Sequence, residues 1–422
     1  MSGDPAIRAR AAETAGWVAE RLSDPARVRA VADWPGAHWS SASLDEGHAG
    51  VALLFGAQAD DPQARRLALR HLSAGVAART HSGGGLFHGD VALAFAAAVA
   101  ARSADDYRTV RAAGTATAVR LVQRLARAPR TLHRLDVVSG LAGIGRYLLA
   151  DGQTDALCDV LRLLVELTRP VHVHGRTVPG WWVGTPPTAV DRAQDFPQGH
   201  FNLGMAHGVS GPLALLSLAT AAGVTVPGQT ATVRAMAQWL VDRLHPGPHG
   251  PYWPDRLTFE EEARGRAVRP PARGAWCYGT PGVARAVHLA GGALGQRQWC
   301  DAALGAVRVL FGRPAHEWPV RDASLCHGAA GLLVVGSVMA ADSGDTALAA
   351  VLPALAERVL AFFDESAPFG FRYTDAEMEL TEDRAGTLMG AAGVALALRH
   401  FADPVPRQAE VPVPWEAALL VC

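Results

Sequence analysis

The sequence predicts an all-α fold, an α/α toroid in which seven inner helices are surrounded by seven outer helices. Three observations favour this architecture. A glycine turn repeats along the chain, each turn is followed by an almost wholly apolar segment, and an amphipathic segment separates successive turns. Apolar residues make up 49% and charged residues 19% of the 422 residues, a balance typical of a globular protein with a large core.

The repeated turn has the form Gly-x-x-Gly. Six copies begin at Gly47, Gly140, Gly208, Gly279, Gly328 and Gly390, and a degenerate seventh begins at Gly89, with Ala92 in place of the second glycine. Because glycine lets the backbone turn tightly, each copy can lead directly into a helix. We expect the turns to gather at one end of the inner ring, where the helix N-termini point donors and positive dipole ends at a shared cavity. An open superhelical solenoid is the rival arrangement.

The segments between the turns carry apolar residues at three- and four-residue spacing, with Arg, Asp and Glu on the opposite face. Helices are therefore expected over residues 6–22, 63–78, 154–168, 230–244 and 347–363. Since these helices keep one charged face, they belong to the outer layer. The segments after the turns are apolar nearly all round and should be buried.

The chain is expected to form a single domain over residues 1–422, interrupted by two long loops at 172–205 and 246–273. Loops of this length in a compact domain are usually functional, so we interpret them as lids or walls of a substrate groove, with ordinary surface insertions as the alternative. The tail, residues 402–422, is rich in proline and is expected to be an extended strap.

Composition excludes several functions. All 39 basic residues are Arg, so a Schiff-base lysine and a lysine-containing P-loop are ruled out. The formal net charge of −1 gives no global field that would attract nucleic acid. We find no secretory signal and no apolar run of the roughly 18–20 residues that would span a bilayer. The five cysteines, an odd number, point to a reducing compartment and a cytoplasmic protein.

Metal-type ligands occupy equivalent places beside two successive glycine turns. Cys277 lies two residues before Gly279, and Cys326 and His327 directly precede Gly328. Neighbouring turns of a ring would face one cavity, and a Cys2His set leaves zinc one open position, as in catalytic sites. A buried structural cysteine is the ordinary interpretation of any one of them, but the shared placement favours a Zn²⁺ site. Cys158, Cys300 and Cys422 have no such context.

Other polar residues lie near the turns. His207 precedes Gly208 as His327 precedes Gly328, so it could be a fourth ligand or an acid/base group, and Asp136 and Arg273 lie four residues before Gly140 and Cys277. Each could orient a histidine or a carbonyl, although a lone Asp or Arg is more often solvated. His48 and His88 are interpreted as structural, and His245 and His249 as exposed loop residues.

These residues together resemble the lanthipeptide (lantibiotic) cyclases of the LanC family, in particular the sequences around Asp136, His207, Arg273 with Trp276-Cys277-Tyr278-Gly279, and Cys326-His327-Gly328. The resemblance covers about residues 45–400 and includes the seven repeats. It implies an α/α toroid with Zn²⁺ held by Cys277, Cys326 and His327, with His207 and Asp136 as acid/base candidates and Arg273 as a supporting cation. Ala92 and Met389 depart from the family pattern, away from the implied site. The chain resembles the stand-alone, class I type.

The resemblance implies an enzyme that forms thioether rings by adding a peptide cysteine thiolate to dehydroalanine or dehydrobutyrine. Its partner would be a dehydrated precursor peptide, leader plus core, and a lanthipeptide dehydratase or a peripheral membrane-associated synthetase complex is compatible with it. Three alternatives stay open: a LanC-like protein that binds glutathione and adds it to dehydroamino acids, a toroidal terpene cyclase or prenyltransferase, and a non-catalytic scaffold.

Overall fold

The computed structural model describes residues 4–78, 84–128, 132–187, 193–265, 274–375, 380–404 and 413–422. The chain divides into two compact units, and each is described by itself. Unit 1 comprises Met1–Ala118 and Pro314–Ala418, and unit 2 comprises Val119–Arg313 and Leu419–Cys422. The boundary falls within helix α6 (Arg108–Arg127). The organisation of the chain as a single domain stays a prediction.

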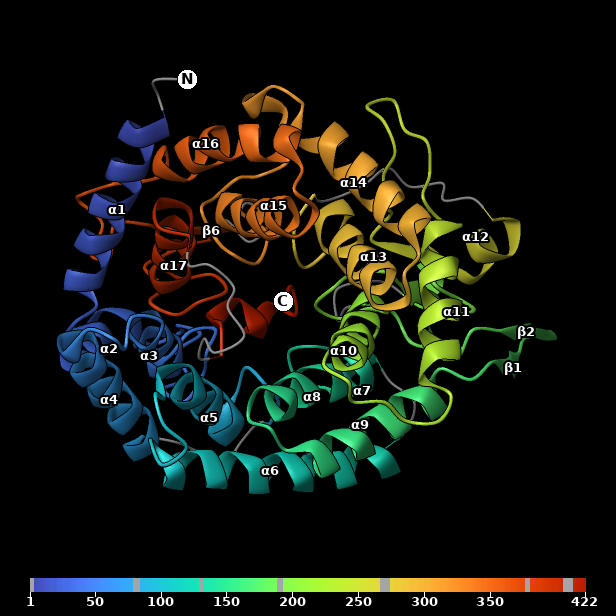
Figure 1. Ribbon diagram of the computed structural model, residues 1–422, viewed down its shortest axis with the longest axis horizontal. Coiled ribbons are helices and arrows are strands. Elements are labelled where there is room, and N and C mark those ends of the chain that lie inside the picture. The colour runs from blue at the N-terminus through green and yellow to red at the C-terminus, as the bar shows by residue number, and fades with distance from the viewer. Residues whose placement is uncertain are drawn as a thin grey trace. The chain divides into compact units, whose positions relative to one another are not determined.

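In unit 1, buried helices are covered by amphipathic ones (Figure 1). The buried helices are α3 (His48–Gly56), α5 (Gly89–Ala100), α15 (Ala329–Ser343) and α17 (Ala391–Ala402). Helix α3 packs on α4 (Pro62–Ala77), α15 on α16 (Thr346–Leu360) and α17 on α1 (Asp4–Arg21). The buried helices also contact one another, in the order α15, α17, α3, α5. Unit 1 also contains helix α2 (Pro25–Ala32) and the 3-10 helix η2 (Ala315–Glu317).

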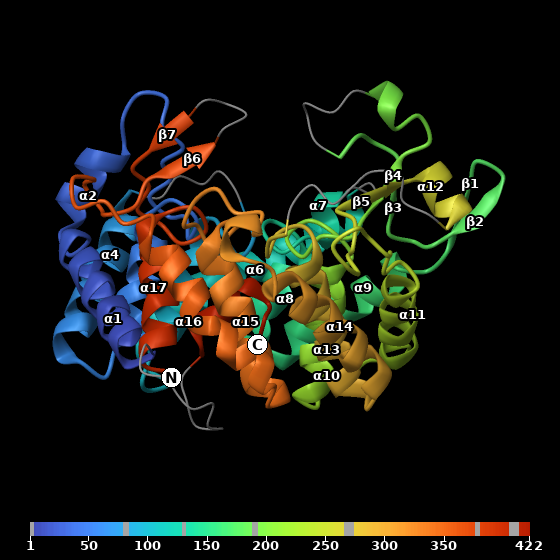
Figure 2. The same cartoon turned by 90° about the horizontal axis from the view of Figure 1, so that it is seen from above.

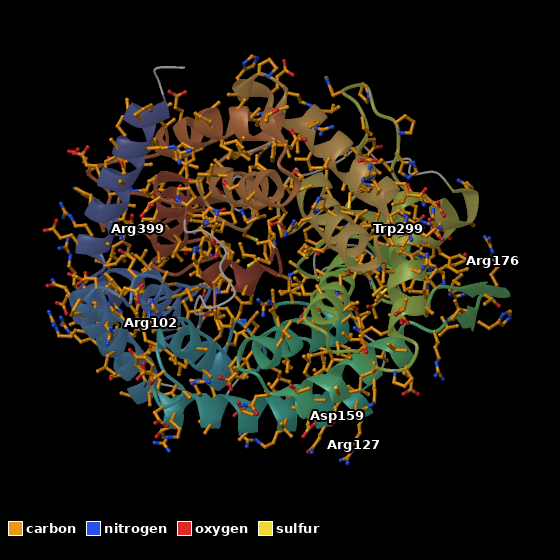
Figure 3. The ribbon with its side chains drawn as sticks, in the orientation of Figure 1. Arg102, Arg127, Asp159, Arg176, Trp299 and Arg399 are labelled. Carbon is orange, nitrogen blue, oxygen red and sulfur yellow. The ribbon has the colours of Figure 1, made fainter. Side chains whose placement is uncertain are left out.

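Unit 2 repeats this arrangement. Its buried helices are α8 (Leu141–Ala150), α10 (Ser210–Ala221) and α13 (Thr280–Leu294), and its outer helices are α9 (Thr154–Leu167), α11 (Gln229–Val241) and α14 (Arg297–Phe311). Short helices α7 (Leu132–Leu135), α12 (Phe259–Arg264) and η1 (Ala193–Asp195) lie between them. Exposed charged side chains such as Asp159 lie on the outer helices, whereas Trp299 is buried (Figure 3).

The described helices confirm the alternation predicted from sequence: the seven that follow glycine turns are buried nearly all round, and those between keep an exposed face. Asp61 caps α4, because its Oδ1 accepts from Gln63 N at 2.9 Å.

The glycine turns share one backbone geometry. In five of the seven copies the N–H of the second glycine donates to the carbonyl seven residues earlier, as Gly50 N does to Ser43 O and Gly282 N to Ala275 O. The chain before the turn therefore folds back over the start of the helix. A Cβ at Gly282 would lie 2.0 Å from Trp276 O, and one at Gly50 would lie 2.1 Å from Leu44 O. Close backbone approach is thus the reason for the second glycine of the repeat.

The two inserts of unit 2 contain paired strands, which were not predicted from the sequence (Figure 2). Strands β1 (Val171–Val173) and β2 (Arg176–Val178) form a hairpin, and β3 (Trp182–Val183), β4 (His200–Asn202) and β5 (Arg256–Thr258) form an antiparallel sheet. In that sheet Phe201 pairs with Leu257, so the two inserts hold each other. In unit 1, β6 (Tyr373–Asp375) pairs with β7 (Leu380–Glu382).

The described end of the tail corrects the expectation of an extended strap. Residues Trp415–Leu419 form the 3-10 helix η3, and the side chains from Trp415 to Val421 are buried. Within the described residues, no helix combines the length and apolarity needed to cross a membrane.

Candidate active site

The glycine turns within each unit are tied together by backbone hydrogen bonds. In unit 2, Val137 N donates to Ala206 O at 2.9 Å and Ala206 N donates to Cys277 O at 3.3 Å, which links three successive turns. In unit 1, Cys326 N donates to Leu388 O at 2.8 Å. Ala206, Cys277, Cys326 and Leu388 each lie two positions before the first glycine of their turn, as the repeat predicts, and Val137 lies three positions before Gly140.

Asp136 and His207, from two neighbouring turns of unit 2, are in direct contact. His207 Nδ1 lies 3.0 Å from Asp136 Oδ2, and the other carboxylate oxygen accepts from Ser139 N at 2.7 Å. Asp136 is fully buried, whereas a third of the His207 side chain is exposed. The carboxylate thus holds one ring nitrogen of His207 and leaves Nε2 as the nitrogen that is not engaged by Asp136.

Tyr278 is a neighbour of His207 that the sequence analysis did not single out. Its ring centroid lies 6.3 Å from that of His207, and its hydroxyl accepts from Asn202 Nδ2 at 3.1 Å. Burial raises the pKa of the Tyr278 hydroxyl, which therefore stays protonated at neutral pH. The guanidinium of Arg256 lies 5.9 Å from the Tyr278 ring centroid. Its position next to Cys277 was the sequence signal that could have identified Tyr278. Asn202 and Arg256 lie on strands β4 and β5, which were not predicted.

Cys277 lies in the third of the hydrogen-bonded turns of unit 2, with only 3% of its surface exposed. Its carbonyl accepts from the backbone N–H of Ala206, the residue next to His207, so the turns that contain Cys277 and His207 are held in fixed register.

In unit 1, Cys326 and His327 precede Gly328, the N-cap of α15. His327 Nε2 lies 3.6 Å from Asp322 Oδ2, and the His327 ring meets Tyr373 edge-on at 5.6 Å between centroids. Asp322 is buried, and its Oδ1 accepts from Ser324 N at 2.7 Å. A carboxylate beside a histidine is the usual arrangement that orients an imidazole for metal binding.

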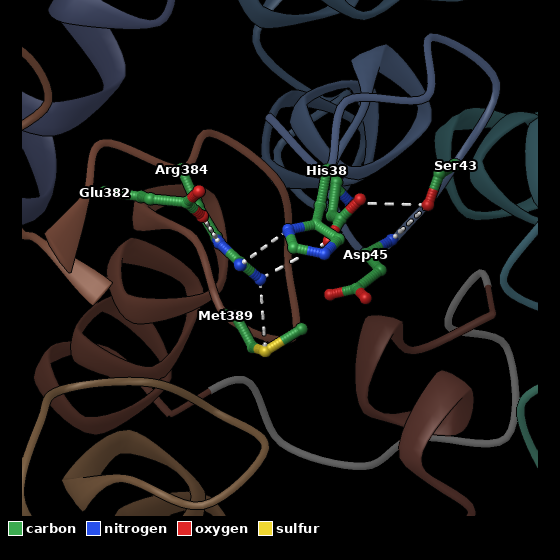
Figure 4. A network of polar contacts seen from close by, with 7 residues as sticks. His38, Ser43, Asp45, Glu382, Arg384 and Met389 are labelled. Atoms are coloured by element: carbon green, nitrogen blue, oxygen red, sulfur yellow. Dashed lines mark hydrogen bonds and ion pairs between the residues drawn. The ribbon is translucent and has the colours of Figure 1, made fainter. Parts of the chain in front are cut away.

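Arg384 is the centre of a network of polar groups in unit 1 (Figure 4). Its guanidinium donates to Glu382 Oε2 at 2.6 Å and to Glu46 Oε1 at 3.3 Å, and contacts Nδ1 of His38 at 3.3 Å. It also lies 4.2 Å from the ring centroid of Tyr373. Met389, which departs from the family pattern, offers its sulfur to the same guanidinium at 3.3 Å.

This network carries more carboxylates than cations. Burial raises the pKa of Asp45 to about 6 despite the opposing charge of Arg384. Burial also raises the pKa of Glu46 to about 8, and the charge of Asp45 adds to this effect while Arg384 opposes it. Both carboxyls therefore retain protons at a higher pH than exposed ones would.

The remaining predicted residues have varied surroundings. Arg273 lies outside the described residues. His48 is buried, with Nδ1 at 3.2 Å from Nδ1 of His71, and burial lowers its pKa to about 4, which agrees with a structural role. His249 is exposed as expected, but the prediction for His245 was wrong: its side chain is buried, and its N–H donates to Tyr252 O as part of a short antiparallel bridge.

Comparison with known proteins agrees with the LanC resemblance. The family model described as lanthionine synthetase C-like protein matches residues 38–419. The chain belongs to this family. It is 25% identical over 209 residues to the nisin biosynthesis protein NisC of Lactococcus lactis subsp. lactis, an alignment that covers 48% of each protein. The match thus spans about half the length of that curated relative.

A solved structure of nisin cyclase is similar over most of this LanC-like chain, with a TM-score of 0.74. The similarity covers 90% of this chain and 92% of the nisin cyclase chain, at 19% sequence identity. It shows the fold, which is the α/α toroid predicted from sequence.

Proposed function

We propose that this LanC-like protein is a zinc-dependent lanthipeptide cyclase that forms lanthionine and methyllanthionine rings. The observation that carries the proposal is the Asp136–His207 pair, held by backbone hydrogen bonds in one row with Cys277. An imidazole oriented by a buried carboxylate beside a soft metal ligand suits a reaction that joins sulfur to carbon and moves one proton.

The proposed Zn²⁺ would be held by Cys277 of unit 2 and by Cys326 and His327 of unit 1. Each of these three side chains offers one ligand atom, and none of the three is exposed. Two thiolates and an imidazole fit zinc and leave one coordination position for a substrate. Zinc, when bound, would lower the pKa of the substrate cysteine so that its sulfur is ionised near neutral pH.

Residues of the protein itself would transfer the proton. As the substrate sulfur bonds to the β-carbon of the dehydroamino acid, the alkene electron pair moves toward the neighbouring carbonyl, and the Cα of the resulting enolate then takes one proton. With Nδ1 facing Asp136, His207 Nε2 is the nitrogen that we assign to deliver it. The thiol loses one proton and Cα gains one, so the product has the mass of the substrate.

Two neighbours support this assignment. Because the Tyr278 hydroxyl accepts its hydrogen bond from Asn202, its own hydrogen remains available for the developing enolate oxygen. Asp136 would stabilise the imidazolium form of His207 in the proton donor state. Arg273 stays a proposed supporting cation. The substrate would be a dehydrated precursor peptide, delivered by a lanthipeptide dehydratase or a peripheral synthetase complex in the cytoplasm.

The test is incubation of the zinc-loaded protein with a dehydrated precursor peptide, measuring free thiol by alkylation and mass by mass spectrometry. We expect loss of free thiol at unchanged mass, and loss of this activity in Cys277→Ala together with stoichiometric zinc. Cys158→Ala is the control, since Cys158 lies on outer helix α9. A Cys277→Ala protein that keeps one equivalent of zinc would remove the ligand assignment. Thiol loss with added glutathione but not with the peptide would favour the glutathione alternative.

A further inference from the structure

Leu419, Leu420 and Val421 are buried in unit 2 and Cys422 is half-buried. Buried side chains bind the carbonyls of three of these four residues. Trp276 Nε1 donates to Leu419 O at 2.9 Å, and Arg285 Nε donates to Val421 O at 2.7 Å. Arg146 donates to Cys422 O through Nε at 3.2 Å and through Nη2 at 3.0 Å. Arg285 and Arg146 lie on the buried helices α13 and α8, with exposed fractions of 0% and 6%. Placing two buried guanidinium groups on one short segment indicates that its conformation is strongly specified.

The backbone of this segment supports the same conclusion. Leu420 has a φ of 54°, a left-handed conformation that non-glycine residues rarely adopt, and its side chain is fully buried. Such a conformation persists only where the surroundings determine it. At Leu420 the carbonyls on either side are both bound, by Trp276 before it and by Arg285 after it.

Trp276 connects this segment to the proposed ligand turn. It directly precedes Cys277 and is fully buried. Its neighbour Ala275 donates to Tyr278 O at 2.9 Å and accepts from Gly282 N at 3.3 Å, so the turn around Cys277 is closed on itself. The hydrogen bond from the indole N–H of Trp276 to Leu419 O links this closed turn to a segment 143 residues away in the chain.

We propose that residues 419–422 are a positioning element for Cys277 that acts through Trp276. The metal-binding part of this inference rests on the proposed function. The segment holds the indole, the indole holds the backbone before Cys277, and the Cys277 sulfur is thereby kept in the orientation in which it would bind zinc. Loosening the segment lowers zinc affinity without removing a ligand.

The experiment compares two pairs of full-length variants. Trp276→Phe removes the indole N–H and keeps an aromatic ring, and Trp299→Phe is its control, because Trp299 is also buried in unit 2 and donates to Gln238 Oε1 on outer helix α11. Leu420→Pro cannot adopt a positive φ, whereas Leu420→Gly can, although both lose the leucine side chain.

Two readouts are measured on each variant. The first is zinc affinity, by competition with a chromophoric chelator, together with the absorption spectrum of the Co²⁺-substituted protein. The second is hydrogen exchange of the backbone amides of residues 275–282 in the metal-free protein. The second readout needs no zinc, so it tests the positioning role even if the wild-type protein binds no metal, an outcome that would instead overturn the proposed function.

We expect Trp276→Phe and Leu420→Pro to weaken zinc binding about tenfold, the effect of losing one buried hydrogen bond, and to speed exchange in 275–282. Trp299→Phe should leave both readouts as in the wild type, and Leu420→Gly should lie much nearer the wild type than Leu420→Pro. The double variant Trp276→Phe/Leu420→Pro should be little worse than either single variant, because both break one connection. Equal exchange in Trp276→Phe and Trp299→Phe, or in the two Leu420 variants, would overturn the inference.

Discussion

At the scale of single residues, both carboxylate oxygens of Asp136 have a defined task. One accepts from Ser139 N and keeps the backbone before Gly140 in place, and the other faces His207 Nδ1. An amide at this position could preserve the first contact, but it would place an N–H group or a neutral oxygen against the imidazole. The tautomer and basicity of His207 would change while the turn stayed folded.

We therefore predict that Asp136→Asn lowers the cyclisation rate at least about a hundredfold, the range of a lost acid/base group, with little change in thermal stability. The measurement is the rate of thiol loss from the dehydrated peptide, with a denaturation curve for each protein. Asp345→Asn is a matched control, because Asp345 is also a buried aspartate but caps α16 in unit 1. An Asp136→Asn rate within about threefold of the wild type would contradict the acid/base assignment.

Glu46 gives a second prediction at this scale. Burial raises its pKa to about 8, so the folded protein binds its proton more tightly than the unfolded chain does. The stability contributed by this group is present below the unfolded pKa, near 4.5, and is lost as the pH rises toward 8. Glu46→Gln should thus make the metal-free protein more stable than the wild type at pH 8.5, by roughly 1–2 kcal/mol after allowance for its partial exposure.

The measurement for Glu46→Gln is urea denaturation of both proteins at pH 5.5 and pH 8.5. Taking the difference between variant and wild type removes the contributions of His48, His71 and other groups that titrate in both. Exposed Glu13 on α1, as Glu13→Gln, is the control for a change of net charge. A difference that does not grow with pH would contradict the effect of burial on Glu46.

At the scale of elements, the glycine turn lets the backbone fold back tightly over the start of a buried helix. Its second glycine has no space for a side chain, because the carbonyl six residues earlier lies directly over it, as Trp276 O does at Gly282. Gly292 in α13 is not under this restriction. A Cβ at Gly292, near the end of α13, would meet no atom within 4 Å.

These two glycines of α13 predict opposite effects. Gly282→Ala should destabilise the protein by about 1–3 kcal/mol or more, since backbone must move to admit the methyl group. Gly292→Ala should stabilise it by about 0.4–1 kcal/mol, because alanine restricts the unfolded chain and favours the helix. Chemical denaturation checks both. Similar effects of the two substitutions would show that helix propensity, and not the close approach at the turn, determines the glycine of the repeat.

At the scale of the whole molecule, the proposed zinc would be shared by residues of both compact units, Cys277 in one and Cys326 with His327 in the other. A ligand that binds only the folded state stabilises it by mass action, by about 2.7 kcal/mol at a hundred times its dissociation constant. Because the proposed zinc ligands come from both units, zinc should stabilise both units against unfolding.

Removal of zinc by a chelator should therefore lower the unfolding midpoint of both units. We would follow hydrogen exchange in α3 and α17 for unit 1 and in α10 and α13 for unit 2, with and without zinc. Cys277→Ala should make exchange in both units insensitive to zinc. Protection of one unit alone by zinc in the wild type would indicate that the ligands do not act together.

Much of this protein was determined by its sequence alone. The repeat of a glycine turn, a buried helix and an amphipathic helix specified the α/α toroid, because helical periodicity is a local property of the chain and six of the seven copies keep the second glycine. The repeat also placed Cys277, His207, Cys326 and His327 at equivalent positions before their glycines, which the structure retains within each unit. For these residues, the position within the repeat in the sequence therefore predicts the position within the repeat in the structure.

Only the tertiary structure decided which side chains meet. The pairing of Asp136 with His207, the approach of Asn202 to Tyr278, and the contact of Arg384 with His38 join residues between 71 and 346 positions apart, for which a single sequence holds no periodic signal. The paired strands of the inserts were missed because each is only two or three residues long and gains stability from its partner strand. The tail was expected to be extended, yet its described end contains a 3-10 helix. Trp276, Arg285 and Arg146 bind carbonyls of residues 419–422 at this end. Local preference could not reveal that conformation, since side chains from distant helices determine it.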